Sequence, residues 1–254
     1  MDRIKYLQRI GLREDTISPD IETLRRLHRA HLLSVPFENL DIHWKRPIAL
    51  DVDLFYRKVV VEGRGGFCYE LNGLFNELLI SIGFTTRLIS ARVGRPDGGF
   101  GPEFDHAAIV VSVAGREYLA DVGFGDFATE PLRFAVDEEQ LDSNGVFKIE
   151  EADGEAFVVK KQVGDEWKNE YLFTDIEREL AEFTAMCDFQ QYSPDSHFTK
   201  GKICSIMTEN GRKTISETSF VLRVDGRPSH EEAIRNEDDF ALVLEREFGI
   251  RKYG

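Results

Sequence analysis

The sequence has few cysteines and no long apolar run. Three cysteines, an odd and low number, argue against a disulfide framework and for free thiols in a reducing compartment, so we expect a cytoplasmic protein. The apolar runs all fall short of the length of about 18 residues that a transmembrane helix needs. The first residues also lack the apolar core and small-residue site of a secretory signal. These absences predict neither membrane insertion nor export.

Positive charge is also scarce. The chain has 32 Lys and Arg against 46 Asp and Glu, a formal net charge of −14. Such a surface repels nucleic acid and anionic membranes, so neither is expected as a partner. An anionic small molecule would need a local basic patch to overcome the same field.

Helical periodicity dominates the first third of the chain. Ser18 is the expected N-cap of a first helix that has Pro19 in its first position, and Asp51 is the expected cap of a second helix. Gly83 is the expected C-terminal stop of a third. The spacing of apolar residues predicts helices over 19–31, 51–60 and 68–82.

From Phe84 onward the apolar period changes to two. Separators rich in Gly and Asp between short strands are typical of a barrel or a strongly curved sheet. The predicted strands are 86–93, 106–113, 117–122, 132–136, 146–150 and 157–162.

The remaining part mixes helices and strands without a flexible linker. A helix over 175–189 is followed by a hairpin signal at Asn210-Gly211, between strands 204–208 and 213–216, and a last helix near 237–248. We therefore expect an α+β fold of three compact subdomains that share interfaces.

The stretch Arg64-Gly65-Gly66-Phe67-Cys68 carries the strongest chemical signal. Two glycines lead directly into a helix whose first turn holds Cys68, where they allow a sharp turn and leave room for a substrate. The unpaired N–H groups and the positive dipole of a helix start favour a thiolate and could bind an oxyanion. The alternative is a small buried hydrophobic residue, which is the usual role of a free cysteine. Cys187 and Cys204 lack this setting and are interpreted as core cysteines.

His106 and Asp121 are candidates for the base and the residue that orients it. Each lies in an otherwise apolar predicted strand, and a buried carboxylate needs a partner. If the two strands are joined by the two-residue turn Ala114-Gly115, both side chains point to one face as diagonal neighbours. A three-residue turn would place them on opposite faces. The alternatives are a core histidine and a strand-end carboxylate bonded to loop N–H groups.

The order Cys…His…Asp fits papain-like and transglutaminase-like chemistry. His28 and His31 lie three residues apart on one predicted helix, but no third ligand accompanies them. We therefore interpret them as a core or surface pair and predict no metal site.

Five motifs in this order resemble the arylamine N-acetyltransferase family. They are VPFENL, RGGFCYELNGLF, DHAAIVV, LADVGFGD and YSPDSHF, spread over residues 35–198. The resemblance implies a helical bundle with the nucleophile (1–83), a β-barrel with the histidine and aspartate (84–190) and an α/β lid (191–254). At its centre it implies a Cys-His-Asp core like that of cysteine peptidases and transglutaminases.

The resemblance also implies a ping-pong mechanism without a metal. Cys68, as a thiolate paired with protonated His106, would take an acetyl group from acetyl-CoA. An arylamine, hydrazine or N-hydroxyarylamine would then attack the thioester, with Asp121 orienting His106.

Further contacts follow from the resemblance alone. The implied acceptor pocket contains Phe37, Val93 and Phe124, which could equally be ordinary core residues. The residues implied to contact CoA are Gly98, Gly99, Phe100, Gly101 and Ser196. Their alternatives are a flexible turn and a loop serine.

Two places depart from the family pattern. Glu103, Phe104 and Asp105 precede His106, where many relatives carry small or hydroxyl residues, and Asp126 replaces a basic or small residue. These two differences could change which acceptor is preferred and how CoA is positioned.

Two alternatives share the same three residues. A papain-like or transglutaminase-like cysteine hydrolase would have an open groove for a peptide instead of an enclosed pocket lined by Phe. A catalytically silent binding module would keep the three residues without their chemistry.

Overall fold

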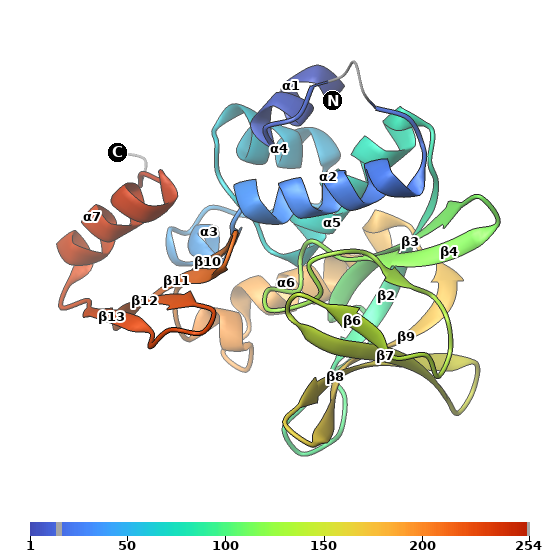
Figure 1. Cartoon of the computed structure of the whole chain (residues 1–254). Coiled ribbons are helices and arrows are strands. Elements are labelled where there is room, and N and C mark those ends of the chain that lie inside the picture. Colours follow the sequence, from blue (N-terminus) through green and yellow to red (C-terminus); the bar gives the residue numbers. More distant parts are fainter. Residues whose placement is uncertain (14–16, 253–254) are drawn as a thin grey trace.

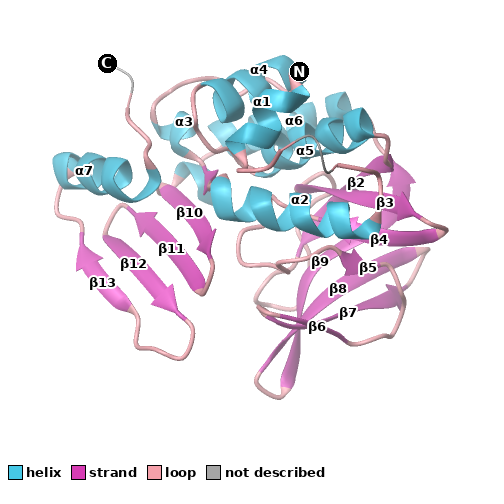
Figure 2. Ribbon diagram, turned by 45° about the horizontal axis from the view of Figure 1, so that its top comes forward, coloured by secondary structure: helices cyan, strands magenta, loops and turns pink. Residues whose placement is uncertain are grey.

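The computed structural model describes residues 1–13 and 17–252 of the chain. A group of helices lies against a large curved sheet on one side and a small sheet on the other (Figure 1). Figure 2 shows α2 (Ile21–Ser34) between the two sheets. Its Arg25 pairs with Glu130 of the large-sheet segment and its Arg29 with Glu209 of the small one. The predicted α+β architecture is confirmed.

The three predicted helices are present, with one correction, and two further helices at 3–9 and 40–43 were not predicted. The first long helix is capped by Asp20, whose Oδ1 accepts the N–H of Thr23 at 2.8 Å, and not by Ser18. The Ser18 hydroxyl instead donates to the Asp20 carboxylate, the stronger acceptor, so the helix starts two residues later than predicted. The helices are α1 (Arg3–Arg9), α2 (Ile21–Ser34), α3 (Leu40–His43), α4 (Val52–Tyr56), a π-helical turn (Arg57–Val61) and α5 (Cys68–Ile82).

Helix α5 is the centre of the core. Its first eight residues are all buried, and it packs against both α4 and the strands β2 (Thr85–Val93) and β3 (His106–Val113). As predicted, it ends at Gly83, where φ is +106°. Asp51 caps α4 as predicted, through the N–H groups of Asp53 and Leu54.

The large sheet is antiparallel and nearly closed. Its order is β5-β4-β3-β2-β9-β8-β7-β6, so β5 and β6 are its two edges. The side-chain amide of Gln140 in β6 accepts the N–H of Arg133 at 2.6 Å and donates to its C=O at 2.9 Å. Gln140 thereby bridges the two edge strands, which have no backbone pairing with each other. The sheet is therefore barrel-like, as predicted. The other strands are β4 (Arg116–Ala120), β5 (Leu132–Arg133), β6 (Gln140–Asp142), β7 (Gly145–Ala152), β8 (Ala156–Val163) and β9 (Glu166–Glu177).

Strand β9 was not predicted from the sequence, and neither was β6. In β9 the apolar residues are irregularly spaced among Glu, Lys and Asn, so no period of two marks the strand, and the helix predicted to start at 175 overlaps its end. Pairing with β2 and β8 on both sides outweighs this local preference. The helical region begins later, with a 3₁₀ turn (Leu180–Phe183) and α6 (Thr184–Tyr192).

The small sheet combines both ends of the chain. Strand β1 (Phe37–Glu38), within the VPFENL motif, pairs with β10 (Ile203–Thr208), the first strand of the C-terminal meander. The division of the chain into 1–83, 84–190 and 191–254 stays a prediction. The meander continues with β11 (Gly211–Ser216), β12 (Ser219–Val224) and β13 (His230–Ala233), of which the last two were not predicted, and ends in α7 (Glu237–Phe248).

The predicted β10–β11 hairpin is present, but its turn is shifted. Thr208 pairs with Gly211, so the two turn residues are Glu209 and Asn210 and not Asn210-Gly211. Gly211 has φ +148°, and a Cβ there would lie 2.1 Å from the carbonyl oxygen of Arg223 on β12. Gly211 is therefore required by the close approach of β12 rather than by the turn. Among the described residues, no helix is both long and apolar enough to span a bilayer.

A buried cluster of charges holds the start of α5. Lys58 Nζ lies 2.9 Å from both Asp41 Oδ2 and Glu70 Oε1, and Arg64 Nε donates to Glu38 Oε1 at 2.9 Å. Burial lowers the pKa of Lys58, but the three carboxylates outweigh it and hold that pKa above its ordinary value. Burial raises the pKa of Glu70, which Lys58 offsets only in part. The cluster ties β1, α3 and the π-helical turn to the first turn of α5.

We expect Lys58→Met to lower the free energy of unfolding by about 3–5 kcal/mol at neutral pH, because it leaves the buried Glu70 carboxylate without its cation, whereas Glu38 and Asp41 keep Arg64. The Glu70 carboxyl would then have a folded pKa further above the unfolded value of about 4. The stability of the variant is therefore greatest below that pH and is lost as pH rises. Urea unfolding at about pH 5 and about pH 7.5 measures this difference.

Lys160→Met is the matched control, because Lys160 pairs with Glu150 on the partly exposed barrel surface. It should change stability by about 1 kcal/mol or less at either pH. Equal losses in the two variants would contradict the role given to the cluster.

Candidate active site

Cys68 is the first residue of α5 and is only 4% exposed. The two glycines before it are needed for packing and not, as predicted, for substrate space. A Cβ on Gly65 would lie 2.0 Å from the carbonyl oxygen of Pro36, and one on Gly66 would lie 2.8 Å from Cβ of Glu70. The glycines thus let β1 and the charge cluster close around the start of α5.

His106 and Asp121 meet through the predicted hairpin. Val113 pairs with Arg116, so the turn has the two residues Ala114 and Gly115, with φ +51° and +77°. Strand β4 ends at Ala120, one residue before Asp121, and not at residue 122 as predicted. His106 Nε2–H donates to Asp121 Oδ2 at 2.7 Å, and both side chains are almost completely buried.

Two further donors hold Asp121. Asn72 Nδ2 donates to its Oδ1 at 2.8 Å, and the N–H of Gly123 donates to the same oxygen at 3.0 Å. Burial raises the pKa of Asp121, but the charge and hydrogen bond of His106, with these two donors, outweigh it and keep that pKa below its ordinary value. Asp121 is therefore an ionised partner for an imidazole.

Cys68 and His106 line one cavity of about 620 Å³. A Cβ on Gly123 would lie 2.9 Å from Cα of Cys68, so the segment after Asp121 packs directly on the start of α5. With Nε2 of His106 bound to Asp121, Nδ1 is the ring nitrogen left for the cavity. Burial, together with the nearby Asp105 and Asp121, raises the pKa of the Cys68 thiol, while the N–H of Ala107 lowers it. A thiolate at this place therefore needs a cation beside it.

Two aromatic rings pack against the imidazole of His106. Phe124 packs edge-on against His106 at 5.0 Å between ring centroids, and Tyr171 of β9 packs against it at 5.4 Å. Burial raises the pKa of Tyr171 well above its usual value, so its hydroxyl stays neutral. Sequence reasoning missed Tyr171 because it missed β9.

The predicted acceptor residues Phe37, Val93 and Phe124 all line the cavity of Cys68. Phe198 joins them, 6.0 Å from the ring of Phe37, and was not singled out although it lies in the YSPDSHF motif. The side of the cavity opposite these aromatic rings is formed by the small sheet and by the chain just before β10. The cavity residues there are Lys200, Lys202, Ile203, Ser205, Arg212, Thr214 and Arg223.

The residues predicted to contact CoA lie apart from Cys68. Phe100, Gly101 and Ser196 line a neighbouring cavity of about 690 Å³, which shares Val93, Asp105 and His197 with the first. Gly98 and Gly99 form the turn beside it, where the N–H of Gly99 binds Asp97 Oδ1 at 2.9 Å.

Ser196 is engaged within the protein. Its hydroxyl donates to Gln190 Oε1 at 2.6 Å, and Gln190 Nε2 donates to Asp105 Oδ1 at 2.7 Å. Burial raises the pKa of Asp105. This chain of three side chains forms part of the wall between the two cavities.

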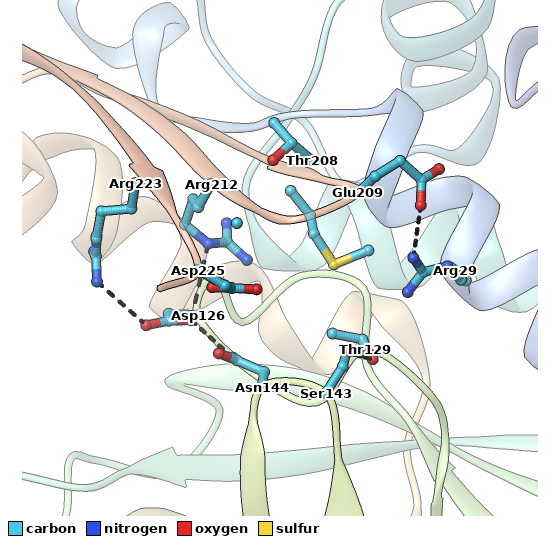
Figure 3. A pocket seen from close by; sticks show the side chains of 12 residues that line it. Arg29, Asp126, Thr129, Ser143, Asn144, Thr208, Glu209, Arg212, Arg223 and Asp225 are labelled. Atoms are coloured by element: carbon cyan, nitrogen blue, oxygen red, sulfur yellow. Dashed lines mark hydrogen bonds and ion pairs between the residues drawn. The ribbon is translucent and has the colours of Figure 1, made fainter. Parts of the chain in front are cut away.

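Asp126 joins the barrel to the small sheet. Figure 3 shows it between Arg212, Arg223 and Asn144, and Asn144 Nδ2 donates to it at 2.8 Å. Arg212 Nη2 donates to the carbonyl oxygen of Gly125 at 2.6 Å and so fixes the residue that follows Phe124. Three residues, Asp126, Arg212 and Arg223, line both the Cys68 cavity and the small polar cavity of Figure 3.

Within residues 1–13 and 17–252, no group of three His, Cys, Asp or Glu side chains is arranged to hold a metal. His28 and His31 are both buried in the interior. The rings of both pack against Phe75 of α5, at 6.2 Å and 5.4 Å between ring centroids.

The chain is similar to known proteins over almost its whole length. The model of the N-acetyltransferase family matches residues 20–252. An arylamine N-acetyltransferase from Mycolicibacterium smegmatis is 33% identical over 236 residues, 91% of this chain and 85% of that protein. The solved structure of the M. tuberculosis arylamine N-acetyltransferase has a TM-score of 0.90 at 29% identity, covering 98% of this chain and 94% of that one. That of the Mycobacterium marinum enzyme in complex with CoA has a TM-score of 0.89 at 28% identity, covering 98% and 93%.

We expect iodoacetamide to alkylate Cys68 with an apparent pKa below the usual thiol value of about 8.5, because His106 can supply the cation. That pKa belongs to the coupled pair of side chains. In His106→Ala the apparent pKa should rise above the usual value, because burial and two carboxylates then act on the thiol alone. Alkylation rates against pH, followed by peptide mass spectrometry, measure both values.

His197→Ala is the control, since His197 lines the same cavity without contacting Asp121. It should keep the low apparent pKa. An ordinary thiol profile in the unmodified protein would contradict the pairing of Cys68 with His106.

Proposed function

Because the chain belongs to the arylamine N-acetyltransferase family, we propose that it transfers an acetyl group from acetyl-CoA to an arylamine, hydrazine or N-hydroxyarylamine through Cys68. The observation that carries this assignment is the buried His106–Asp121 hydrogen bond beside the cavity that Cys68 lines.

The proposed reaction has two half-reactions. The Cys68 thiolate attacks the acetyl carbonyl carbon, a new S–C bond forms, and CoA leaves with the proton of His106. The acceptor nitrogen, or the oxygen of an N-hydroxyarylamine, then attacks the thioester. His106 takes its proton and the Cys68 thiolate is released. Asp121 holds Nε2 of His106, so that Nδ1 is the nitrogen that gives up a proton in the first half-reaction and takes one in the second.

The charges around the cavity support an anionic acyl donor. The chain as a whole carries −14, yet Lys200, Lys202, Arg212 and Arg223 gather on the small-sheet side of the cavity against Asp105 and Asp126. Arg212 and Arg223 pair with Asp126, and Lys202 pairs with Glu237, but the cations still outnumber the carboxylates here, which favours a CoA phosphate in a negative protein. We propose that the pantetheine arm reaches Cys68 from this side.

The neighbouring cavity is the second candidate for the nucleotide end. It contains Phe100, Gly101 and Ser196, and its arginines Arg92 and Arg95 are balanced by Asp105 and Asp195. Contacts of CoA with these three residues, and with Gly98 and Gly99, stay predictions.

The apolar part of the cavity favours a small flat acceptor. Phe37 and Phe124, with Phe198, offer ring faces and edges on which an aromatic amine can stack while its nitrogen reaches the thioester. A cysteine hydrolase would need space for a peptide on both sides of the nucleophile. The small sheet lines the far side of this cavity, so the space beside Cys68 fits a small acceptor better than an extended peptide.

Incubation with acetyl-CoA alone should add one acetyl group, on Cys68, because the first half-reaction needs no acceptor. Cys68→Ala should abolish labelling and turnover. Cys187→Ala and Cys204→Ala should keep most activity, because neither side chain lines the cavity of Cys68 and His106, and burial raises the pKa of both thiols without an imidazole to offset it. Intact and peptide mass spectrometry show the site. Substantial turnover by Cys68→Ala would contradict the whole assignment.

Phe124→Ala should slow transfer to an arylamine by about tenfold, since the lost ring contact is worth about 1.5 kcal/mol, and should slow acetylation of Cys68 less. The expected trace is a burst of free CoA followed by slow turnover. Aromatic amines should also outperform aliphatic amines of similar basicity.

Phe134→Ala is the matched control, because Phe134 packs in the barrel against Phe157 and does not line the cavity. Both of its half-reactions should stay near normal. An equal loss in both half-reactions of Phe124→Ala would make Phe124 a structural residue. Equal acetylation of small peptides would contradict the acceptor class.

A further inference from the structure

A buried histidine outside the three proposed catalytic residues touches the backbone of Asp121. His28, on α2, is 1% exposed. Its Nδ1 lies 3.1 Å from the carbonyl oxygen of Thr129, and its Nε2 lies 3.2 Å from the backbone nitrogen and 3.1 Å from the carbonyl oxygen of Asp121. The ring therefore joins two chain segments that are eight residues apart.

The regular pairing of β4 with β5 stops at the place where the His28 ring lies between the two segments. Strands β4 and β5 pair through Tyr118 with Arg133 and Leu119 with Leu132. Continuing this register would place Asp121 opposite Glu130. Instead β4 ends at Ala120, and the imidazole of His28 lies between Asp121 and Thr129. A buried backbone N–H that loses its ladder partner needs another acceptor, and Nε2 of His28 is that acceptor.

The surroundings select one form of the ring. Burial lowers the pKa of His28, against smaller opposing effects of Thr129, Asp121 and Asp142, so the ring is neutral. A neutral imidazole has one donor and one acceptor. Nδ1–H then donates to the oxygen of Thr129, and Nε2 accepts the N–H of Asp121. Thr129 is itself fixed, because its N–H and hydroxyl both donate to Asp142.

We propose that His28 is a positioning residue that holds the peptide of Asp121, and through it the carboxylate, in line with His106. This inference rests on the proposed function, in which the Asp121–His106 bond sustains the cation beside Cys68. It gives α2 a part in the chemistry: one side chain keeps β4 and β5 apart at the point where the carboxylate must turn toward the imidazole.

The test uses two substitutions that each keep half of the ring's bonding. The amide of Gln reaches the place of Nε2, so His28→Gln can still accept the N–H of Asp121. The amide of Asn reaches the place of Nδ1, so His28→Asn can bind Thr129 but leaves Asp121 without its acceptor. The amides differ by one methylene, so the pair separates bonding to Asp121 from loss of the ring.

His31→Asn is the matched control. His31 lies one turn further along α2, is 0% exposed, and packs on Phe75 as His28 does. In the part of the chain that the structure describes, neither of its ring nitrogens has a hydrogen-bond partner. The substitution removes a buried ring from the same helix without touching Asp121.

The measurement is the pH profile of Cys68 alkylation, with kcat/KM for arylamine acetylation beside it. His28→Asn should raise the apparent pKa by about one unit, which is about tenfold slower alkylation below that pKa, and should lower kcat/KM by a similar factor. His28→Gln and His31→Asn should keep the profile of the unmodified protein even if their melting temperatures fall.

A shift in His31→Asn as large as in His28→Asn, or an equal shift in His28→Gln, would overturn the inference. Nitrogen-15 NMR of the unmodified protein gives a second readout that needs no variant. It should show His28 neutral with the proton on Nδ1, and a proton on Nε2 would overturn the inference. An ordinary thiol profile in the unmodified protein would instead contradict the proposed function itself, so the two failures are distinguishable.

Discussion

Asp121 is a charged carboxylate whose side chain has no exposure to solvent, and the rest of the site depends on the hydrogen bonds that stabilise this buried charge. A buried carboxylate without partners is expensive, so each of its contacts must come from a side chain or N–H group fixed elsewhere. His106 comes from β3, Asn72 from α5 and the N–H of Gly123 from the chain just beyond. Once these are satisfied, the imidazole has one orientation, and its free nitrogen is Nδ1.

The same segment joins the barrel to the helices. Asn72 also donates to the carbonyl oxygen of Ala107 at 2.6 Å and accepts the N–H of Val122 at 2.9 Å, so one amide of α5 bonds to both strand segments of the hairpin. Gly123 packs on the backbone of Cys68. On the other side, the cluster of Lys58, Arg64 and three carboxylates fixes the start of α5 against β1. Cys68 is thus placed by contacts with both sheets before any substrate binds.

Local chemistry explains which parts could be predicted. The Gly-Gly lead into a helix marked Cys68, and the hairpin allowed His106 and Asp121 to share one face, but only the observed register shows that the turn has two residues. By contrast, β9 pairs with its sequence neighbour β8 on one side and with β2, which is distant in sequence, on the other, and the Glu, Lys and Asn residues at its start interrupt the apolar pattern of a strand. Tyr171 was missed for that reason. His28 was interpreted only as one of a core or surface pair of histidines, because its partner is a backbone N–H on another element.

The central claim is that His106, oriented by Asp121, keeps Cys68 ionised in a place where burial alone would keep it neutral. The most direct measurement is the ultraviolet thiolate absorbance of the unmodified protein minus that of Cys68→Ala, recorded against pH. The account predicts one thiolate equivalent at neutral pH, and none at that pH in the same difference measured on the His106→Ala background. Absorbance that appears only above about pH 8.5 in the unmodified protein, as for an ordinary cysteine, would contradict it.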